Sequence, residues 1–292
     1  MVRRTTTATF PDTMRARYRE GHFIMEGRQN VQHIVSKDGT HIAYERTGKG
    51  PSLALIHGTG TDHTYWTSII PKLKQYFTVY TIDRRGRGES GDTTPYAIQN
   101  EFDDVAALVD AIPRPVRLFG HSYGALCSLE AARLTTHIHR LALYEPPVYT
   151  TIDVSYPPDT LARFNALLEA GRTEEALLLL HEVGQTPAEE LNLLRSLPNW
   201  QARVSATPTI PREVFSVKNY VFDRSRFTEL KMPILLLLGS ESSPFYTAAT
   251  ETLHESLPHS RLAMLPKQRH EAVVTAPELL LHEVLGYFLD DS

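Results

Sequence analysis

The stretch VRLFGHSYGAL, residues 116–126, decides the fold. A short apolar run ends at Gly120, and a helix-forming Ala-Leu pair follows Gly124. Between the two glycines stands Ser122. A serine in such a strand–turn–helix bend is held in a strained backbone conformation, with its hydroxyl at the carboxyl end of the strand. The glycines let the strand and helix backbones pass closely, so we interpret Ser122 as a nucleophile.

Further short apolar runs on both sides of this stretch have the length and composition of buried strands. These runs lie at 52–56, 77–82, 141–144, 234–238 and 261–265, and helical patterns lie at 101–111, 125–134 and 277–289. Strands that alternate with helices indicate an α/β fold with a parallel sheet covered on both faces. Asp38-Gly39, between the runs 31–36 and 41–45, is a hairpin signal and predicts antiparallel strands at one edge.

The alternation is interrupted between residues 148 and 228. Amphipathic helical patterns at 161–168, 174–183 and 188–197 are separated by prolines, without a strand pattern of comparable strength. We therefore expect a helical cap over 148–228, inserted into a core formed by 31–147 and 229–292. Residues 1–30 are rich in arginine and lack the apolar stretch of a secretory signal, so we expect them to form an N-terminal arm.

Composition and charge narrow the function classes. The 292 residues carry a formal net charge of -4, which argues against nucleic-acid binding, and no apolar run approaches the ~20 residues of a membrane helix. The single cysteine, Cys127, cannot form an intrachain disulfide and fits a cytoplasmic location. No cluster has metal-ligand spacing and no phosphate-binding glycine loop occurs, so we expect neither a metal nor a cofactor. Arginines alternate with glycines in 84–88, and we interpret this segment as a turn after a strand.

The region from about 40 to 290 resembles the α/β-hydrolase superfamily. The resemblance rests on 120–124, on His57-Gly58-Thr59-Gly60, on Trp66, on Asp83-Arg84-Arg85-Gly86-Arg87-Gly88-Glu89-Ser90 and on a late histidine. It is closest in pattern to the esterase and haloperoxidase-like branch with a helical cap. The resemblance implies an eight-stranded, mostly parallel sheet with the site at the carboxyl ends of the strands.

The resemblance also assigns roles around Ser122. His270, after the last strand and before the terminal helix, stands where the family has its catalytic histidine. A neutral imidazole can accept the serine proton and return it to the leaving group. The backbone N–H groups of Thr59 and Tyr123 would form the oxyanion hole. His57 is expected to brace its loop rather than to transfer protons.

The acid of the triad has two candidates. Many relatives carry an aspartate in the turn after the seventh strand, but this turn has Ser242 at that place. A hydroxyl cannot stabilise an imidazolium as a carboxylate does. Either Glu241 in the same turn or Glu145 at the end of the sixth strand supplies the acid. We favour Glu145, because a carboxylate at the end of an apolar strand is costly unless its charge is paired.

Together these features predict a serine hydrolase that cleaves a carboxylic ester, or a related acyl bond, through an acyl-enzyme. The expected partner is a small, partly hydrophobic substrate, and the oligomeric state stays open. Ser122 excludes the dehalogenase branch, which needs a carboxylate nucleophile. Two alternatives are a ligand receptor that keeps the fold, favoured only by the missing carboxylate at position 242, and a lyase or cyclase of a biosynthetic pathway.

Overall fold

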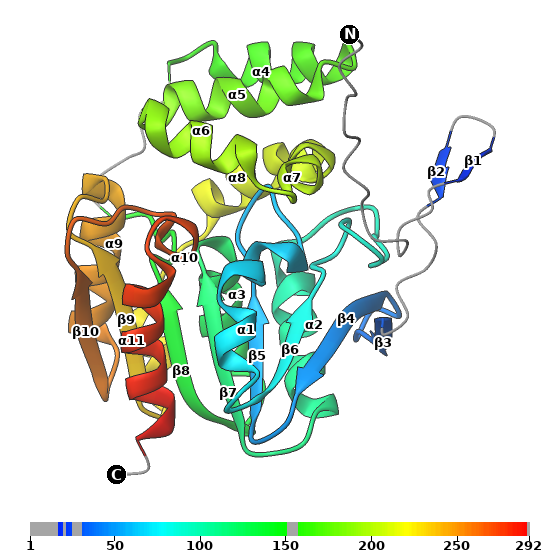
Figure 1. The fold of residues 1–292 in the computed structure, drawn as a ribbon. Helices are drawn as coiled ribbons and strands as arrows, with labels where there is room; N and C mark the ends of the chain where they lie inside the picture. The colour runs from blue at the N-terminus through cyan, green and yellow to red at the C-terminus, as the bar shows by residue number, and fades with distance from the viewer. Residues whose placement is uncertain (1–16, 20–21, 25–30, 151–156, 291–292) are drawn as a thin grey trace, which may run out of the picture.

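An eight-stranded sheet forms the centre of the molecule in the computed structural model, which describes residues 17–19, 22–24, 31–150 and 157–290 (Figure 1). From one edge to the other the strands are β10 (Ser260–Leu265), β9 (Ile234–Gly239), β8 (Ile138–Tyr144), β7 (Val116–His121), β5 (Ser52–Ile56), β6 (Thr78–Ile82), β4 (His41–Gly48) and β3 (Val31–Val35). β4 pairs antiparallel with both β3 and β6, and the other pairs are parallel. The predicted mostly parallel sheet with an antiparallel edge is confirmed.

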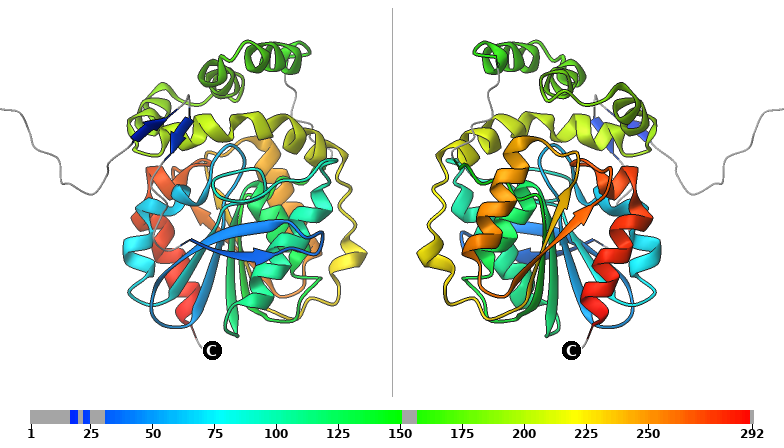
Figure 2. Two further views of the ribbon diagram at one scale, coloured as in Figure 1. Left: turned by 90° about the vertical axis from the view of Figure 1, so that its right-hand side faces the viewer. Right: turned by 90° about the vertical axis from the view of Figure 1, so that its left-hand side faces the viewer.

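Helices cover both faces of the sheet (Figure 2). Successive strand residues alternate between the two faces: Leu118 packs in the apolar cluster on one side and Phe119 in the cluster on the other. The first face carries α2 (Ile98–Ala111), α3 (Tyr123–Ala131) and α9 (Pro244–Ser256), and the second carries α1 (Ile70–Leu73), α10 (Ala272–Thr275), α11 (Pro277–Leu289) and the 3-10 helix His63–Ser68. Both faces are buried, which explains why the central strands read as continuous apolar runs.

The segment between β8 and β9 is helical, as expected. It contains α4 (Thr160–Glu169), α5 (Thr173–Val183), α6 (Ala188–Ser196), α7 (Trp200–Ala206), α8 (Ile210–Asn219) and the 3-10 helices Thr207–Thr209 and Arg224–Phe227. These helices have an apolar cluster of their own, built around Phe164, Leu177, Leu194, Trp200 and Ile210. In Figure 1 α4 to α8 lie together beyond one end of the sheet, whereas Phe227 of the last 3-10 helix packs in the apolar cluster on the first face.

Helices α7 and α8 lie outside the predicted helical patterns. The prolines of this region do not all break a helix, because Pro208 lies in the first turn of a 3-10 helix and Pro211 in the first turn of α8. Proline is tolerated there because the first N–H groups of a helix have no intrahelical acceptor.

Near the N-terminus, β1 (Arg17–Arg19) and β2 (His22–Ile24) form a separate two-stranded antiparallel sheet. The rest of the expected N-terminal arm, 1–16, 20–21 and 25–30, lies outside the described residues. Within the described part of the chain, no helix has both the length and the apolar character needed to cross a membrane.

The bend at Ser122 depends on close backbone contacts at its two glycines. A Cβ added at Gly120 would lie 2.6 Å from the Cα of Ala125, and one added at Gly124 would lie 2.3 Å from the carbonyl oxygens of Ile56 and His57. The start of α3 therefore touches the end of β5, which fixes where the serine stands relative to the loop after β5.

We expect Gly124→Ala to lower the free energy of unfolding by about 2 kcal/mol, because the added methyl group must push apart two backbones. Gly286→Ala in α11 is the matched control, since no atom of the described residues lies within 4 Å of a Cβ built there. That change should raise stability by about 0.5–1 kcal/mol through helix propensity. Urea unfolding of both variants measures the difference, and an unchanged midpoint for Gly124→Ala would contradict the close contact.

Candidate active site

Ser122 stands at the carboxyl end of β7 in the predicted bend. Its backbone has φ 53 and ψ -125, a conformation that is unusual for a residue with a Cβ. The Ser122 amide donates to the Tyr144 carbonyl at 2.8 Å, and its own carbonyl accepts from Ala125 and Leu126 at 2.8 and 3.1 Å. The helix therefore begins directly at the serine, two residues earlier than expected, and the strained conformation is held from both sides.

His270 and Glu145 meet beside it. Nδ1 of His270 lies 2.6 Å from Oε2 of Glu145, which is fully buried at the end of β8. The other carboxylate oxygen accepts from the Gly239 amide at 2.8 Å and from the Ser242 hydroxyl at 2.5 Å. A carboxylate at Nδ1 favours the tautomer with the proton on Nδ1, which leaves Nε2 as an acceptor.

Of the two candidate acids, the structure brings Glu145 to His270. Glu241 is exposed, and its backbone amide donates to the Gln268 carbonyl at 2.9 Å. Its carboxylate has no hydrogen bond to His270 within the described residues. Ser242, which stands where many relatives have the acid, instead supports Glu145 through its hydroxyl.

The loop after β5 lies against the serine. A Cβ added at Gly58 would lie 2.9 Å from the Cβ of Ser122, and the next residue, Thr59, lines the same cavity as Ser122. Tyr123 also lines it, and as the first residue of α3 it has a backbone amide without an intrahelical acceptor. Both predicted oxyanion residues thus border the nucleophile.

His57 has the bracing geometry that was expected. Its Nδ1 lies 2.9 Å from the Gly58 carbonyl, and its Nε2 accepts the Arg84 amide at 3.2 Å. Burial, together with the charges of Arg84 and Arg87, holds the pKa of His57 well below its usual range. A neutral imidazole with both nitrogens engaged cannot exchange protons with a substrate.

The arginines at 84–87 point inward. Arg84 forms a bidentate pair with Glu101 of α2, at 2.7 and 2.9 Å, and donates to Glu213 of α8 at 2.5 Å. Arg87 also donates to Glu213, and Arg85 pairs with Asp104 at 2.7 Å. All three guanidinium groups are buried, so this segment presents no basic surface, and Glu213 ties the inserted helices to the core.

One cavity of about 700 Å³ connects the predicted residues, because Ser122, His270, Thr59 and Tyr123 all line it. Apolar and aromatic side chains line it from α5, α8, α9 and the segment after β8: Leu177, Leu180, Val183, Ile210, Val214, Val217, Phe245, Tyr246, Pro147 and Tyr149. Polar and charged side chains also line it: His181, Gln185, Glu190, Arg203, Glu213, Arg269 and Glu271. The cavity can therefore hold a ligand that is partly apolar and partly polar.

Tyr65 and Trp66, both in the 3-10 helix His63–Ser68, differ in their placement. Tyr65 lines the cavity, whereas Trp66 is fully buried in the apolar cluster on the second face of the sheet. Tyr246, Arg203 and Glu271 were not identified from the sequence. The only sequence signal for Glu271 is its place next to His270. Arg203 and Tyr246 lie in helices and have no local signal, and only the fold brings them to the cavity.

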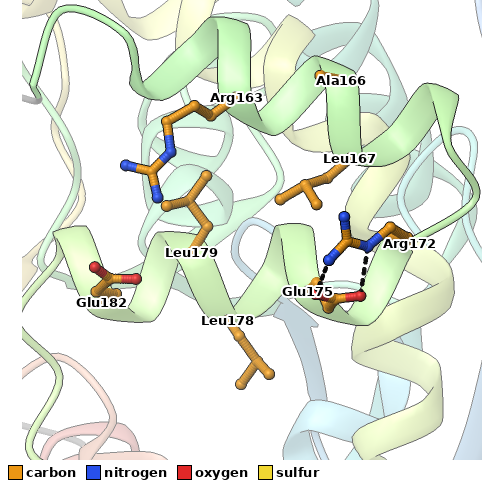
Figure 3. A pocket seen from close by; sticks show the side chains of 8 residues that line it. All are labelled: Arg163, Ala166, Leu167, Arg172, Glu175, Leu178, Leu179 and Glu182. Carbon is orange, nitrogen blue, oxygen red and sulfur yellow. Dashed lines mark hydrogen bonds and ion pairs between the residues drawn. The ribbon is translucent and has the colours of Figure 1, made fainter.

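A second cavity of about 520 Å³ lies between α4 and α5 (Figure 3). Leu167, Leu178 and Leu179 line it together with charged residues, and Arg172 forms a bidentate pair with Glu175 at 2.7 and 2.5 Å. It contains none of the predicted site residues, so the cavity at Ser122 is the candidate active site.

The donor atoms of Asp62, His63 and Asp83 lie within 4.8 Å of one another, as in a metal site. Nδ1 of His63, however, lies 2.6 Å from Oδ1 of Asp83, and Asp62 accepts from the Thr64 amide at 2.9 Å. These bonds engage Nδ1 of His63 and Oδ1 of both Asp62 and Asp83, and they support the loop beside Ser122.

The chain is similar to known proteins over most of its length. Residues 53–283 match the sequence profile of the alpha/beta hydrolase family. The chain is 28% identical over 260 residues to a pimeloyl-[acyl-carrier protein] methyl ester esterase of Aeromonas hydrophila, covering 85% of this chain and 99% of the relative. It is 25% identical to a putative carbamate hydrolase of Agrobacterium fabrum, covering 82% and 94%. A solved alpha/beta hydrolase from Sphaerobacter thermophilus is 33% identical, with a TM-score of 0.75 and coverage of 88% and 100%.

The Glu271–Arg203 pair, at 3.0 Å, predicts a pH-dependent contribution to stability. Burial alone would raise the pKa of Glu271, but Arg203 and His121 outweigh it and hold that pKa at about 2, below its ordinary value of 4.5. A lowered pKa in the folded state adds stability above pH 4.5, and this is lost as the pH falls toward 2.

We therefore expect Glu271→Gln to be less stable than the parent at pH 6. The difference between their free energies of unfolding should be about 1 kcal/mol smaller at pH 3.5. Chemical denaturation of both proteins at the two pH values tests this. A gap that stays constant with pH would show that the carboxylate charge contributes nothing.

Proposed function

This chain belongs to the alpha/beta hydrolase family and is a carboxylesterase-like enzyme, and we propose that it hydrolyses carboxylic esters through Ser122, His270 and Glu145. The observation that carries the proposal is the 2.6 Å contact between His270 and the buried Glu145, at a cavity that Ser122 lines. A histidine held by a carboxylate beside a serine in a strained bend is the arrangement that nucleophilic acyl transfer needs.

In the first half-reaction the Ser122 hydroxyl oxygen attacks the ester carbonyl carbon while Nε2 of His270 takes its proton. The carbonyl oxygen becomes an oxyanion, which accepts hydrogen bonds from the amides of Thr59 and Tyr123. Collapse of this intermediate breaks the bond to the alcohol oxygen, and the imidazolium returns the proton to the departing alcohol. The acyl group is then bound to Ser122 as an ester.

In the second half-reaction a water molecule attacks the acyl-enzyme, again with His270 as base and the same amides at the oxyanion. The carboxylic acid leaves, and Ser122 regains its proton. Glu145 does not exchange protons in this scheme. It fixes the tautomer and orientation of the imidazole, and it stabilises the imidazolium in a site where burial strengthens their attraction. Each oxyanion donor lowers the barrier by about 3–4 kcal/mol.

In this proposal residues 148–228 act as a cap that shapes the substrate pocket. The apolar side chains that line the cavity would hold a hydrophobic part of the substrate, and the polar side chains that line it would bind a polar part. The similarity to methyl ester esterases makes methyl esters of medium-length acyl groups the first substrates to test. Cys127 is buried and is a free thiol, which fits the cytoplasmic location that we propose.

The receptor alternative rested on the missing carboxylate at position 242. Glu145 supplies a carboxylate at His270, and Ser242 donates to it, so that feature no longer favours a binding protein. A lyase or cyclase would use the same residues as acid and base, and detection of the released acid and alcohol separates it from an esterase.

We expect Ser122→Ala to lose at least about 1,000-fold in kcat on short p-nitrophenyl esters, because the nucleophile is removed. The variant should also lose labelling by a fluorophosphonate probe, measured by intact mass. Ser128→Ala is the matched control: it removes a buried serine of the same helix whose hydroxyl donates to the Gly124 carbonyl. If Ser122→Ala were as active as the parent, Ser122 would not be the nucleophile.

The two candidate acids give a separate test. Glu145→Gln should lower kcat by about 1,000-fold or more, because an amide neither fixes the productive tautomer nor stabilises the imidazolium. Glu241→Gln should lose far less, since its carboxylate has no bond to His270 in the described structure. A reversed ranking, with both variants folded by circular dichroism, would move the acid to the turn after β9.

A further inference from the structure

Aromatic rings from two different elements contact the imidazole of His270. The Tyr246 ring, from the first turn of α9, stacks on it with a centroid distance of 4.1 Å and an interplanar angle of 14°. The His121 ring, at the end of β7, lies 4.5 Å away at 43°. The two rings come from different parts of the fold, because β8 lies between β7 and β9 in the sheet and α9 follows β9.

These contacts leave the imidazole little freedom to turn. Nδ1 is held by Glu145, and the backbone carbonyl of His270 accepts from Nε2 of His121 at 2.9 Å. His121 is itself stacked on Tyr65 at 4.9 Å and 13°. Tyr246 and His121 thus both contact the imidazole, and His270 lines the same cavity as Ser122.

The face of a tyrosine ring attracts a cation, because the π system places negative charge above the ring plane. His270 becomes a cation twice in each catalytic cycle of the proposed reaction. A ring stacked at 4.1 Å is within the range where this attraction is significant. The same contact orients the neutral imidazole before the proton moves.

His121 does not oppose this effect. Burial and the neighbouring His270 lower the pKa of His121 to about 3, so that ring is neutral at the pH values where the enzyme would work. A neutral ring next to an imidazolium adds no like-charge repulsion, which leaves Tyr246 free to act on the charge of His270.

Other charged and titratable groups also face His270, and they stay unchanged in a Tyr246 variant. They are Glu145 and Tyr144 from the end of β8, His121 from β7, Tyr65 from the first 3-10 helix, Arg269 and Glu271 from the same loop, Arg203 from α7, Glu190 from α6 and Glu241 after β9. Arg203 is paired with Glu271, so its charge is balanced close to the ring.

We propose that Tyr246 is a positioning residue that acts through His270: its ring holds the imidazole for proton transfer and stabilises the imidazolium that forms. This inference rests on the proposed function, since it needs His270 to act as the base for Ser122. Tyr246 touches the base and lines the cavity, but it takes no proton and makes no bond to the substrate.

The test compares Tyr246→Leu, Tyr246→Phe and the parent between pH 4.5 and 8.5. Leucine keeps an apolar wall without a π face, and phenylalanine keeps the face without the hydroxyl. Two rates are followed: labelling of Ser122 by a fluorophosphonate probe, which needs no known substrate, and kcat/KM for p-nitrophenyl acetate. Circular dichroism and thermal unfolding establish that each variant is folded.

For Tyr246→Leu we expect both rates to fall about tenfold on the plateau of the pH–rate profile. We also expect the acidic limb of that profile to move about half a pH unit lower, because a less stabilised imidazolium forms only at lower pH. Tyr246→Phe should stay within about twofold of the parent, with its limb unmoved. Phe222→Leu is a control outside the cavity: its ring stacks on that of Phe227, and the change should leave the acidic limb in place.

A limb that does not move in a folded Tyr246→Leu would overturn the inference, and so would a Phe variant as impaired as the Leu variant. Both results would leave the proposed function intact if the parent is still labelled at Ser122. Failure of the parent to be labelled at Ser122 would instead overturn the proposed function, and this inference with it.

Discussion

A buried carboxylate that meets an imidazole at the end of a sheet is the interaction on which the rest of this site depends. Glu145 has no exposed surface, and an ionised carboxylate in that position is costly unless it is paired and hydrogen-bonded. Three donors converge on it: His270, the Gly239 amide and the Ser242 hydroxyl. The ends of β8 and β9 and the loop after β10 are therefore fixed together by one charge.

The same requirement explains local backbone features at the strand ends. Ser122 and Glu145 both have positive φ, 53 and 48, at the ends of neighbouring strands. Gly239 ends β9 where an added Cβ would lie 2.4 Å from the Gln268 carbonyl. Strain at such positions persists only where surrounding contacts determine the conformation, and here it places Ser122 at the cavity and Glu145 at His270. The inserted helices are joined to this region by buried pairs at Glu213 and Glu271.

Much of this arrangement could be predicted from the sequence, because the elements concerned have strong local signals. The apolar runs and the Gly-flanked Ser122 predicted the sheet and the bend, and chain position pointed to His270. The choice of Glu145 over Glu241 needed a chemical argument, and the contact with His270 is a long-range one that no local pattern encodes. Helix α8 was missed because Pro211 stands in its first turn, and Pro208 stands in the first turn of the 3-10 helix between α7 and α8. Tyr246 and Arg203 carry no signal of their own, since only the packing of distant segments brings them to the cavity.

A crystal structure of the protein after reaction with a fluorophosphonate would test the central claim most directly. The account predicts a covalent bond from phosphorus to the hydroxyl oxygen of Ser122. It also predicts a phosphonyl oxygen within hydrogen-bond distance of the Thr59 and Tyr123 amides, and His270 still bonded to Glu145. An adduct on another residue, or His270 turned away from Glu145 and toward Glu241, would contradict it.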